Sequence, residues 1–311
     1  MPWLKWVSVL DPGGLYELVD QPPELERPVL VVAMTGFVDA AGATKLAAEH
    51  LRDVGDPVDV ATFDVDQLYD YRARRPPMLF VEDHWEGYET PQIRIQALSD
   101  TAGTRFLMLD GPEPDVQWER FVAAVEQLCQ QLDVRASVGF NSIPMAVPHT
   151  RPLGVTAHAS RRELISDYRP WLQRVQVPGS AVHLLEYRLG EAGRDSMGFS
   201  VHVPHYLAQT DYPAAAQTML EAVSKATGLA LVGESLKEAA AAVKADVDGQ
   251  VERSEEVASV VRALEEQYDA YVAGRGDNLL AADAGPLPTA DELGAELERF
   301  LAEQTDRPDQ Q

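Results

Sequence analysis

Two strand-like runs with a helical pattern between them constrain the fold of this 311-residue chain more than any other feature. The first run, Val29 to Met34, contains no polar residue, which is typical of a strand buried on both faces of a parallel sheet. After a turn at Thr35-Gly36, apolar residues recur at helical spacing from Ala43 to Val54. The second run, Val58 to Phe63, predicts the next strand. Together they predict a β-α-β unit, and with it a sheet that helices cover.

The rest of residues 1–232 extends this α/β domain. Apolar alternation at 93–97 and an apolar run at 106–109 flank a turn, so we expect a hairpin and a mixed sheet. Helical spacing predicts a helix over 118–132 and another that opens at Pro213, which suits a first helical position. Further strands are predicted at 78–82, 136–140, 154–159, 181–187 and 198–203.

Residues beyond 232 have a different character. Helical periodicity over 233–273 predicts a helical hairpin or one long helix, with Asp248-Gly249 as the expected break. A linker is expected at 274–288, a last helix at 289–304 and a disordered tail at 305–311. The apolar stripe of these helices is a candidate partner-binding surface. It consists of Val257, Val261, Leu264, Tyr268, Leu293, Leu297 and Phe300.

The charge of the chain excludes several classes of partner. With 50 acidic and 26 basic residues, the net charge of −24 predicts repulsion of nucleic acids and of anionic membrane surfaces.

Without a long apolar run or a secretory leader pattern, the chain is expected to be cytoplasmic and to have no membrane contact. A single cysteine, Cys129, excludes an internal disulfide and a multi-cysteine metal site. We expect neither metal nor cofactor.

Two loops that follow predicted strands are candidate ligand or interface sites. The first carries Gly36, Phe37 and Asp39 where a strand meets a helix, a place where α/β proteins bind ligands. Its alternative role is a structural turn with Asp39 as the helix cap. In the second, Asn141 ends a predicted strand and a proline-rich loop then carries His149 and Arg151. The basic pair can bind an anion, and the alternative is a rigid structural loop or an oligomer contact.

Several motifs together resemble the proteasome-assembly-chaperone family, in its actinobacterial branch. They are GFVDAAG at 36–42, EPD at 113–115, IPMAVPHTRP at 143–152, LLEYRLG at 184–190 and HVPHYL at 202–207. The resemblance covers about residues 1–270. It implies a three-layer α/β/α sandwich with a mixed, largely parallel sheet, similar to phosphorylase and hydrolase folds. It also implies a homo-oligomer, with a trimer as one arrangement.

The resemblance implies a non-catalytic interaction protein that aids assembly of the α subunits of the 20S proteasome. Some relatives dock through a C-terminal hydrophobic-Tyr-any motif, which the final residues Arg307 to Gln311 lack, so end-on docking is not expected. The alternative is a small-molecule-binding enzyme of nucleoside-phosphorylase-like or hydrolase-like type. We expect no catalytic residues, because the sequence has no complete catalytic motif.

Overall fold

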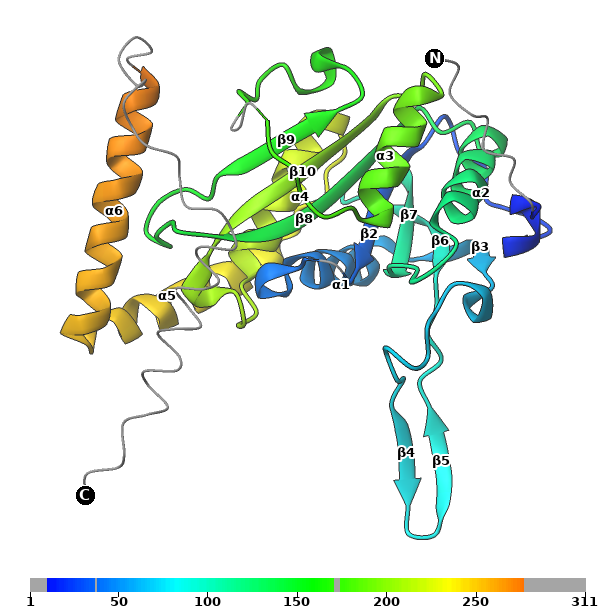
Figure 1. Cartoon of the computed structure of the whole chain (residues 1–311), viewed down its shortest axis with the longest axis horizontal. Helices are drawn as coiled ribbons and strands as arrows, with labels where there is room; N and C mark the ends of the chain where they lie inside the picture. Colours follow the sequence, from blue (N-terminus) through cyan, green and yellow to red (C-terminus); the bar gives the residue numbers. More distant parts are fainter. Residues whose placement is uncertain (1–9, 37, 171–173, 277–311) are drawn as a thin grey trace. The chain divides into compact units, whose positions relative to one another are not determined.

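The main strands form one eight-stranded mixed sheet, in the strand order β1-β3-β6-β7-β2-β8-β10-β9 (Figure 1). The computed structural model describes residues 10–36, 38–170 and 174–276. Contacts divide the chain into two compact units, residues 1–265 and 266–311, and the sheet belongs to the first. Its strands are Tyr16–Leu18 (β1), Val29–Thr35 (β2), Val58–Phe63 (β3), Arg94–Ser99 (β6), Arg105–Pro112 (β7), Ala136–Met145 (β8), Val155–Ala159 (β9) and Ser196–Pro204 (β10).

The middle of the sheet is parallel and its edges are antiparallel. Strand β2 pairs in parallel with β7 and β8, and β8 pairs in parallel with β10. Antiparallel pairs, β6 with β7 and β9 with β10, flank this centre. All residues of β2 from Val29 to Met34 are buried, as its unbroken apolar run predicted. The predicted mixed sheet and its β6–β7 hairpin are thereby confirmed.

Two helical layers cover the sheet, which confirms the predicted three-layer architecture. Helices α1 (Ala43–Gly55) and α4 (Pro213–Thr227) pack on one face, whereas α2 (Trp118–Gln131) and α3 (Ala181–Glu191) pack on the other. Each face of the sheet has its own hydrophobic core, and alternate residues of β2 belong to the two cores. Val31 faces α1 and α4, and Val32 faces α2 and α3. Cys129 lies in the second core, where burial raises the pKa of its thiol to about 12, as expected of a packing residue.

The segment predicted as a strand at 181–187 is helix α3, so that prediction was wrong. The short run Ala181 to Tyr187 reads equally as strand or helix, because its apolar residues are nearly continuous. The side chain of Ser180 accepts a hydrogen bond from the backbone N–H of His183 (3.2 Å) and caps the helix. The buried residues, Ala181, Leu185 and Leu189, recur every four positions, which is helical spacing.

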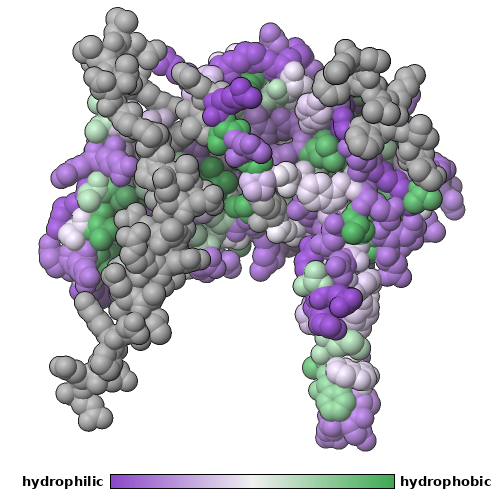
Figure 2. All heavy atoms as spheres, in the orientation of Figure 1, coloured by the Kyte–Doolittle hydropathy of each residue, from purple (hydrophilic) through white to green (hydrophobic). Residues whose placement is uncertain are grey.

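A second, two-stranded sheet projects from the first unit as an arm (Figure 1). Its strands are β4 (Met78–Val81) and β5 (His84–Tyr88), of which only the first was predicted. The arm's large apolar side chains are exposed on both strands. They are Met78 (51%), Leu79 (56%), Phe80 (53%), Trp85 (62%) and Tyr88 (48%). Green atoms in Figure 2 mark the more hydrophobic part of this surface on the arm.

Two helices follow the sheet domain. Helix α5 spans Glu234–Glu252 and α6 spans Glu255–Gly276, so the break falls at 253–254 and not at the predicted Asp248-Gly249. The first unit extends to Glu265 and includes α5. Across the described ranges, no helix combines the length and apolarity needed to cross a membrane.

The predicted partner-binding stripe is only partly exposed. Val257 is 44% exposed, but Val261 and Leu264 are buried. Tyr268 belongs to the second unit, and Leu293, Leu297 and Phe300 lie outside the described residues, as do the predicted linker, last helix and tail.

Candidate functional site

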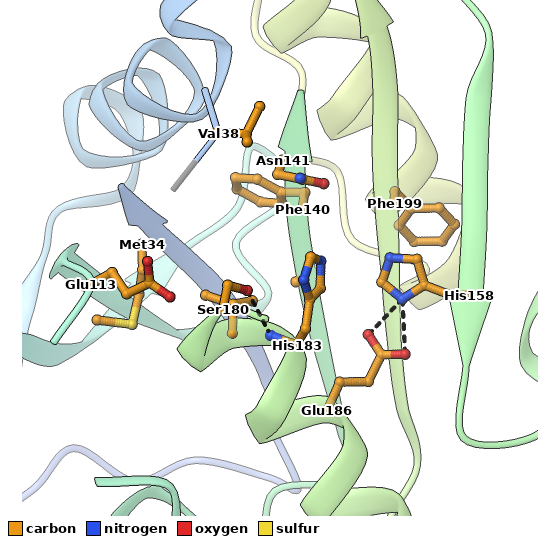
Figure 3. A pocket seen from close by; sticks show the side chains of 12 residues that line it. Met34, Val38, Glu113, Phe140, Asn141, His158, Ser180, His183, Glu186 and Phe199 are labelled. Atoms are coloured by element: carbon orange, nitrogen blue, oxygen red, sulfur yellow. Dashed lines mark hydrogen bonds and ion pairs between the residues drawn. The ribbon is translucent and has the colours of Figure 1, made fainter. Parts of the chain in front are cut away.

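A pocket opens where the central parallel strands end, under the first turn of α3 (Figure 3). In the strand order, the connection from β2 to β3 runs toward one edge of the sheet, and the connection from β7 to β8 runs toward the opposite edge. Such a reversal creates a crevice at the carboxyl ends of the strands, the usual ligand position in open α/β sheets. The pocket has a volume of about 30 Å³. It is lined by Met34, Val38, Glu113, Gly139, Phe140, Asn141, His158, Ser180, Val182, His183, Glu186 and Phe199.

The turn at 36–42 lies beside this pocket, but its carboxylate is occupied by the chain itself. Asp39 accepts hydrogen bonds from the backbone N–H groups of Thr44 (2.7 Å) and Lys45 (3.2 Å) at the start of α1. It also accepts one from the Ser142 hydroxyl (3.1 Å) on β8. Asp39 therefore ties α1 to the sheet, as in the structural alternative for this turn.

Gly36 and Phe37 are the other two predicted site residues of that turn. Gly36 has φ +148°, and a Cβ there would lie 3.1 Å from the Cβ of Glu113, so glycine allows the two loops to approach. Phe37 lies outside the described residues.

Asn141 is the predicted site residue that lines the pocket. It lies on β8, and its Oδ1 accepts a hydrogen bond from the Ser200 hydroxyl on β10 (2.6 Å). In this orientation of the amide, Nδ2 is the group left to donate.

Two histidines and a glutamate that sequence reasoning missed form the polar centre of the pocket. The Nδ1 atom of His158, on β9, lies 2.9 and 2.8 Å from the two carboxylate oxygens of Glu186, on α3. The ring of His183 stands nearly perpendicular to that of His158, with 5.6 Å between the centroids. Burial is the main reason that the pKa of His183 lies below its ordinary value, and the neighbouring His158 lowers it further. The i, i+3 spacing of His183 and Glu186 was the available signal, but only on a helix, and this segment was predicted as a strand.

Glu113 closes the pocket on the side of β7. Its carboxylate accepts a hydrogen bond from the backbone N–H of Ala181, at the amino end of α3. Burial raises the pKa of Glu113, against the opposing effects of that bond and of Arg74. The chain's own carboxylate thus takes the position where a helix would otherwise bind an external anion.

The loop with His149 and Arg151 lies away from the pocket and anchors the helices that follow the sheet domain. The Nδ1 atom of His149 is 2.6 Å from the Tyr206 hydroxyl, and its Nε2 is 3.1 Å from Asp248 Oδ1 on α5. Arg151 Nη1 lies 3.2 Å from Glu265 Oε1 on α6. Neither residue lines the pocket, so the two predicted loops do not form one site.

These histidines predict how stability depends on pH. Burial holds the pKa of His50, His149 and His183 below the ordinary 6.5, so the unfolded chain binds protons more readily than the folded one. Their contribution is complete above pH 6.5 and is lost as the pH falls below that value. Most carboxylates stay ionised above pH 5.5, so their titration does not mask the effect. We expect the Tm to fall between pH 7.5 and 5.5 in circular dichroism melts, and less steeply in His183→Gln. A constant or rising Tm would contradict the assignment.

Comparison with known proteins gives consistent matches. The PAC2 family model matches residues 33–251. A Mycobacterium tuberculosis protein of unknown function is 51% identical, with a TM-score of 0.80 over 94% of this chain and 96% of that one. A Corynebacterium glutamicum protein of unknown function is 36% identical, with a TM-score of 0.79 over 83% and 98%. A Mycobacterium tuberculosis proteasome-assembly chaperone homologue, 23% identical, shares the fold, with a TM-score of 0.69 over 75% and 99%. A search of curated proteins gives no significant match.

Proposed function

The chain belongs to the PAC2 family, and from this premise we propose that it is a non-catalytic interaction protein that self-associates and aids assembly of 20S proteasome α subunits. The chaperone role rests on the family and on a relative described as a proteasome-assembly chaperone homologue. Self-association rests on one observation, the exposed apolar arm formed by β4 and β5.

The arm is hard to explain in an isolated subunit. A two-stranded hairpin without a core is marginally stable in water, because its strands bury little apolar surface. The rings of Phe80 and Trp85 pack edge to face, with 5.0 Å between ring centroids, and both residues remain more than half exposed. A clustered apolar surface of this kind marks a protein contact.

Charge favours a second copy of the chain as the partner of the arm. Residues 78–89, the arm and the residue after it, carry Glu82, Asp83, Glu86 and Glu89 and no lysine or arginine. Arg72 and Arg75, both exposed, lie just before the arm on the same unit. An arm from one copy and the basic segment of the next are therefore complementary.

Light scattering after size exclusion tests self-association. We expect the wild-type chain to form an oligomer and the double variant Phe80→Glu, Trp85→Glu to be monomeric, because the new charges cannot be buried at an apolar contact. Tyr187→Glu is the matched control, since Tyr187 is an aromatic residue on α3 that is 60% exposed. It should leave the oligomer intact, and a monomeric wild type would refute the arm's role.

A reconstitution experiment tests the chaperone role. Purified proteasome α subunits of the source organism would be mixed with the chain, and ring formation would be followed by native gel electrophoresis. We expect faster ring formation with the wild type than with the monomeric variant. Unchanged assembly with a chain that is properly oligomeric would reject the chaperone role and leave self-association standing.

A further inference from the structure

We propose that the pocket under α3 binds the amide-like end of a small neutral ligand, with His158 as the hydrogen-bond acceptor and Asn141 as the donor. An amide-like end is an N–H donor beside a C=O acceptor, as in a carboxamide or a lactam ring. This binding site goes beyond the proposed interaction role and does not depend on it.

Glu186 orients the acceptor. Because both carboxylate oxygens lie within 2.9 Å of His158 Nδ1, that nitrogen carries a proton, and in the neutral form of the ring the lone pair is on Nε2. Figure 3 shows Nε2 on the side of the ring away from Glu186. Gly198 makes room for the pair, since a Cβ there would lie 2.2 Å from His158 Cε1 and 2.8 Å from Glu186 Oε2.

Asn141 supplies the donor. The Ser200 hydroxyl donates to Oδ1 of Asn141, and Nδ2 of Asn141 donates to no described residue. Figure 3 shows the Asn141 amide above the His183 ring, on the same side of the pocket as Phe140. A ligand that donates to His158 and accepts from Asn141 pairs both groups.

His183 adds a further polar group to the pocket. Its ring lines the pocket, and neither ring nitrogen is hydrogen-bonded to a described residue. Both nitrogens are therefore available to a polar ligand.

Charge and size select a neutral group. Glu113 and Glu186 line the pocket and disfavour an anion. Both carboxylates are already bonded, Glu113 to the N–H of Ala181 and Glu186 to His158, and a cation that only donates leaves the Asn141 amide N–H without an acceptor. A volume of about 30 Å³ holds about two water molecules, the size of one amide group. Phe140 and Phe199 supply apolar walls.

Three isosteric probes test this selection on the full-length wild-type protein. Benzamide presents a donor and an acceptor, benzoate presents only acceptors with negative charge, and benzamidinium presents only donors with positive charge. We expect benzamide to bind at least about tenfold more tightly than either ion, because a site built for a hydrogen-bonded pair rejects analogues that lack one partner. The measurement is the shift of the histidine ring signals by NMR during titration. Equal or tighter binding of either ion, or no saturable shift with benzamide, overturns the proposal.

Two variants and a control locate the site. Asn141→Asp replaces the donor by an acceptor, so benzamide should bind about tenfold more weakly and benzamidinium more tightly. Gly198→Ala displaces His158 and should weaken benzamide to a similar degree. His84→Gln is the control, because His84 also bonds to a carboxylate, that of Asp83 (2.9 Å), but lies on the arm. Unchanged benzamide binding in Asn141→Asp contradicts the assignment even if Gly198→Ala does not fold.

Discussion

Gly111→Ala should lower the free energy of unfolding by about 4 kcal/mol, the largest effect that we expect from a single methyl group in this chain. Gly111 lies in β7 with φ +130°, a conformation that favours glycine. A Cβ at this position would lie 2.2 Å from the backbone oxygen of Gln92 and 2.9 Å from the Cα of Ile93. The obstacle is backbone, so no side-chain rotation relieves it. Because Ile93 is fully buried, moving the backbone at 92–93 also disturbs the core.

Urea unfolding monitored by circular dichroism measures this loss. Gly103→Ala is the matched control, because Gly103 also has a positive φ of +85° but its Cβ would meet no atom within 4 Å. It should cost about 1 kcal/mol, from backbone strain alone. If the two variants lose the same stability, steric contact at Gly111 is not the cause.

Asp39→Ala should lower the free energy of unfolding by about 2–3 kcal/mol. The substitution leaves the N–H groups of Thr44 and Lys45 without their acceptor and removes one of the two bonds made by the buried Ser142 hydroxyl. Hydrogen bonds to a charged acceptor are stronger than neutral ones, which sets the upper part of this range. The loss should be seen in the same urea experiment and should loosen α1 from β8.

Asp11→Ala is the control for this variant. Asp11 is exposed and accepts a single backbone hydrogen bond, from Gly13 (3.0 Å), so about 0.5 kcal/mol is expected. If Asp39→Ala unfolds like the wild type but no longer binds a ligand or partner, Asp39 belongs to a functional site and its structural role is refuted.

The sequence predicted those parts of the fold that depend on local periodicity. The run at 29–34 can be buried on both faces only inside a sheet, and helical spacing at 118–132 predicted α2. The motifs at 36–42 and 143–152 indicated the family, which the PAC2 match confirmed. Local periodicity failed at 181–187, because a short and nearly continuous apolar run fits either period and the cap at Ser180 settles the choice.

The site was predicted only in part, for the same reason. Asn141 could be placed because the strand was predicted to end at Phe140, and the carboxyl ends of parallel strands meet at one edge, although β8 continues to Met145. The sequence showed that Asp39 and His149 are polar, but it did not show which residues they contact. Asp39 contacts Ser142 and His149 contacts Asp248, each about 100 residues away in the chain.

What the sequence by itself determined is the α/β class, the buried parallel centre and the family, because each follows from patterns within a few tens of residues. Only the tertiary structure decided that His158 of an edge strand meets Glu186 of α3 over Gly198. It also decided that the arm at 78–88 stays exposed while Val261 and Leu264 are buried. The physical reason is that a pocket and an exposed surface depend on which distant segments pack together, and that choice is made by the strand order and by the packing of helices on the sheet.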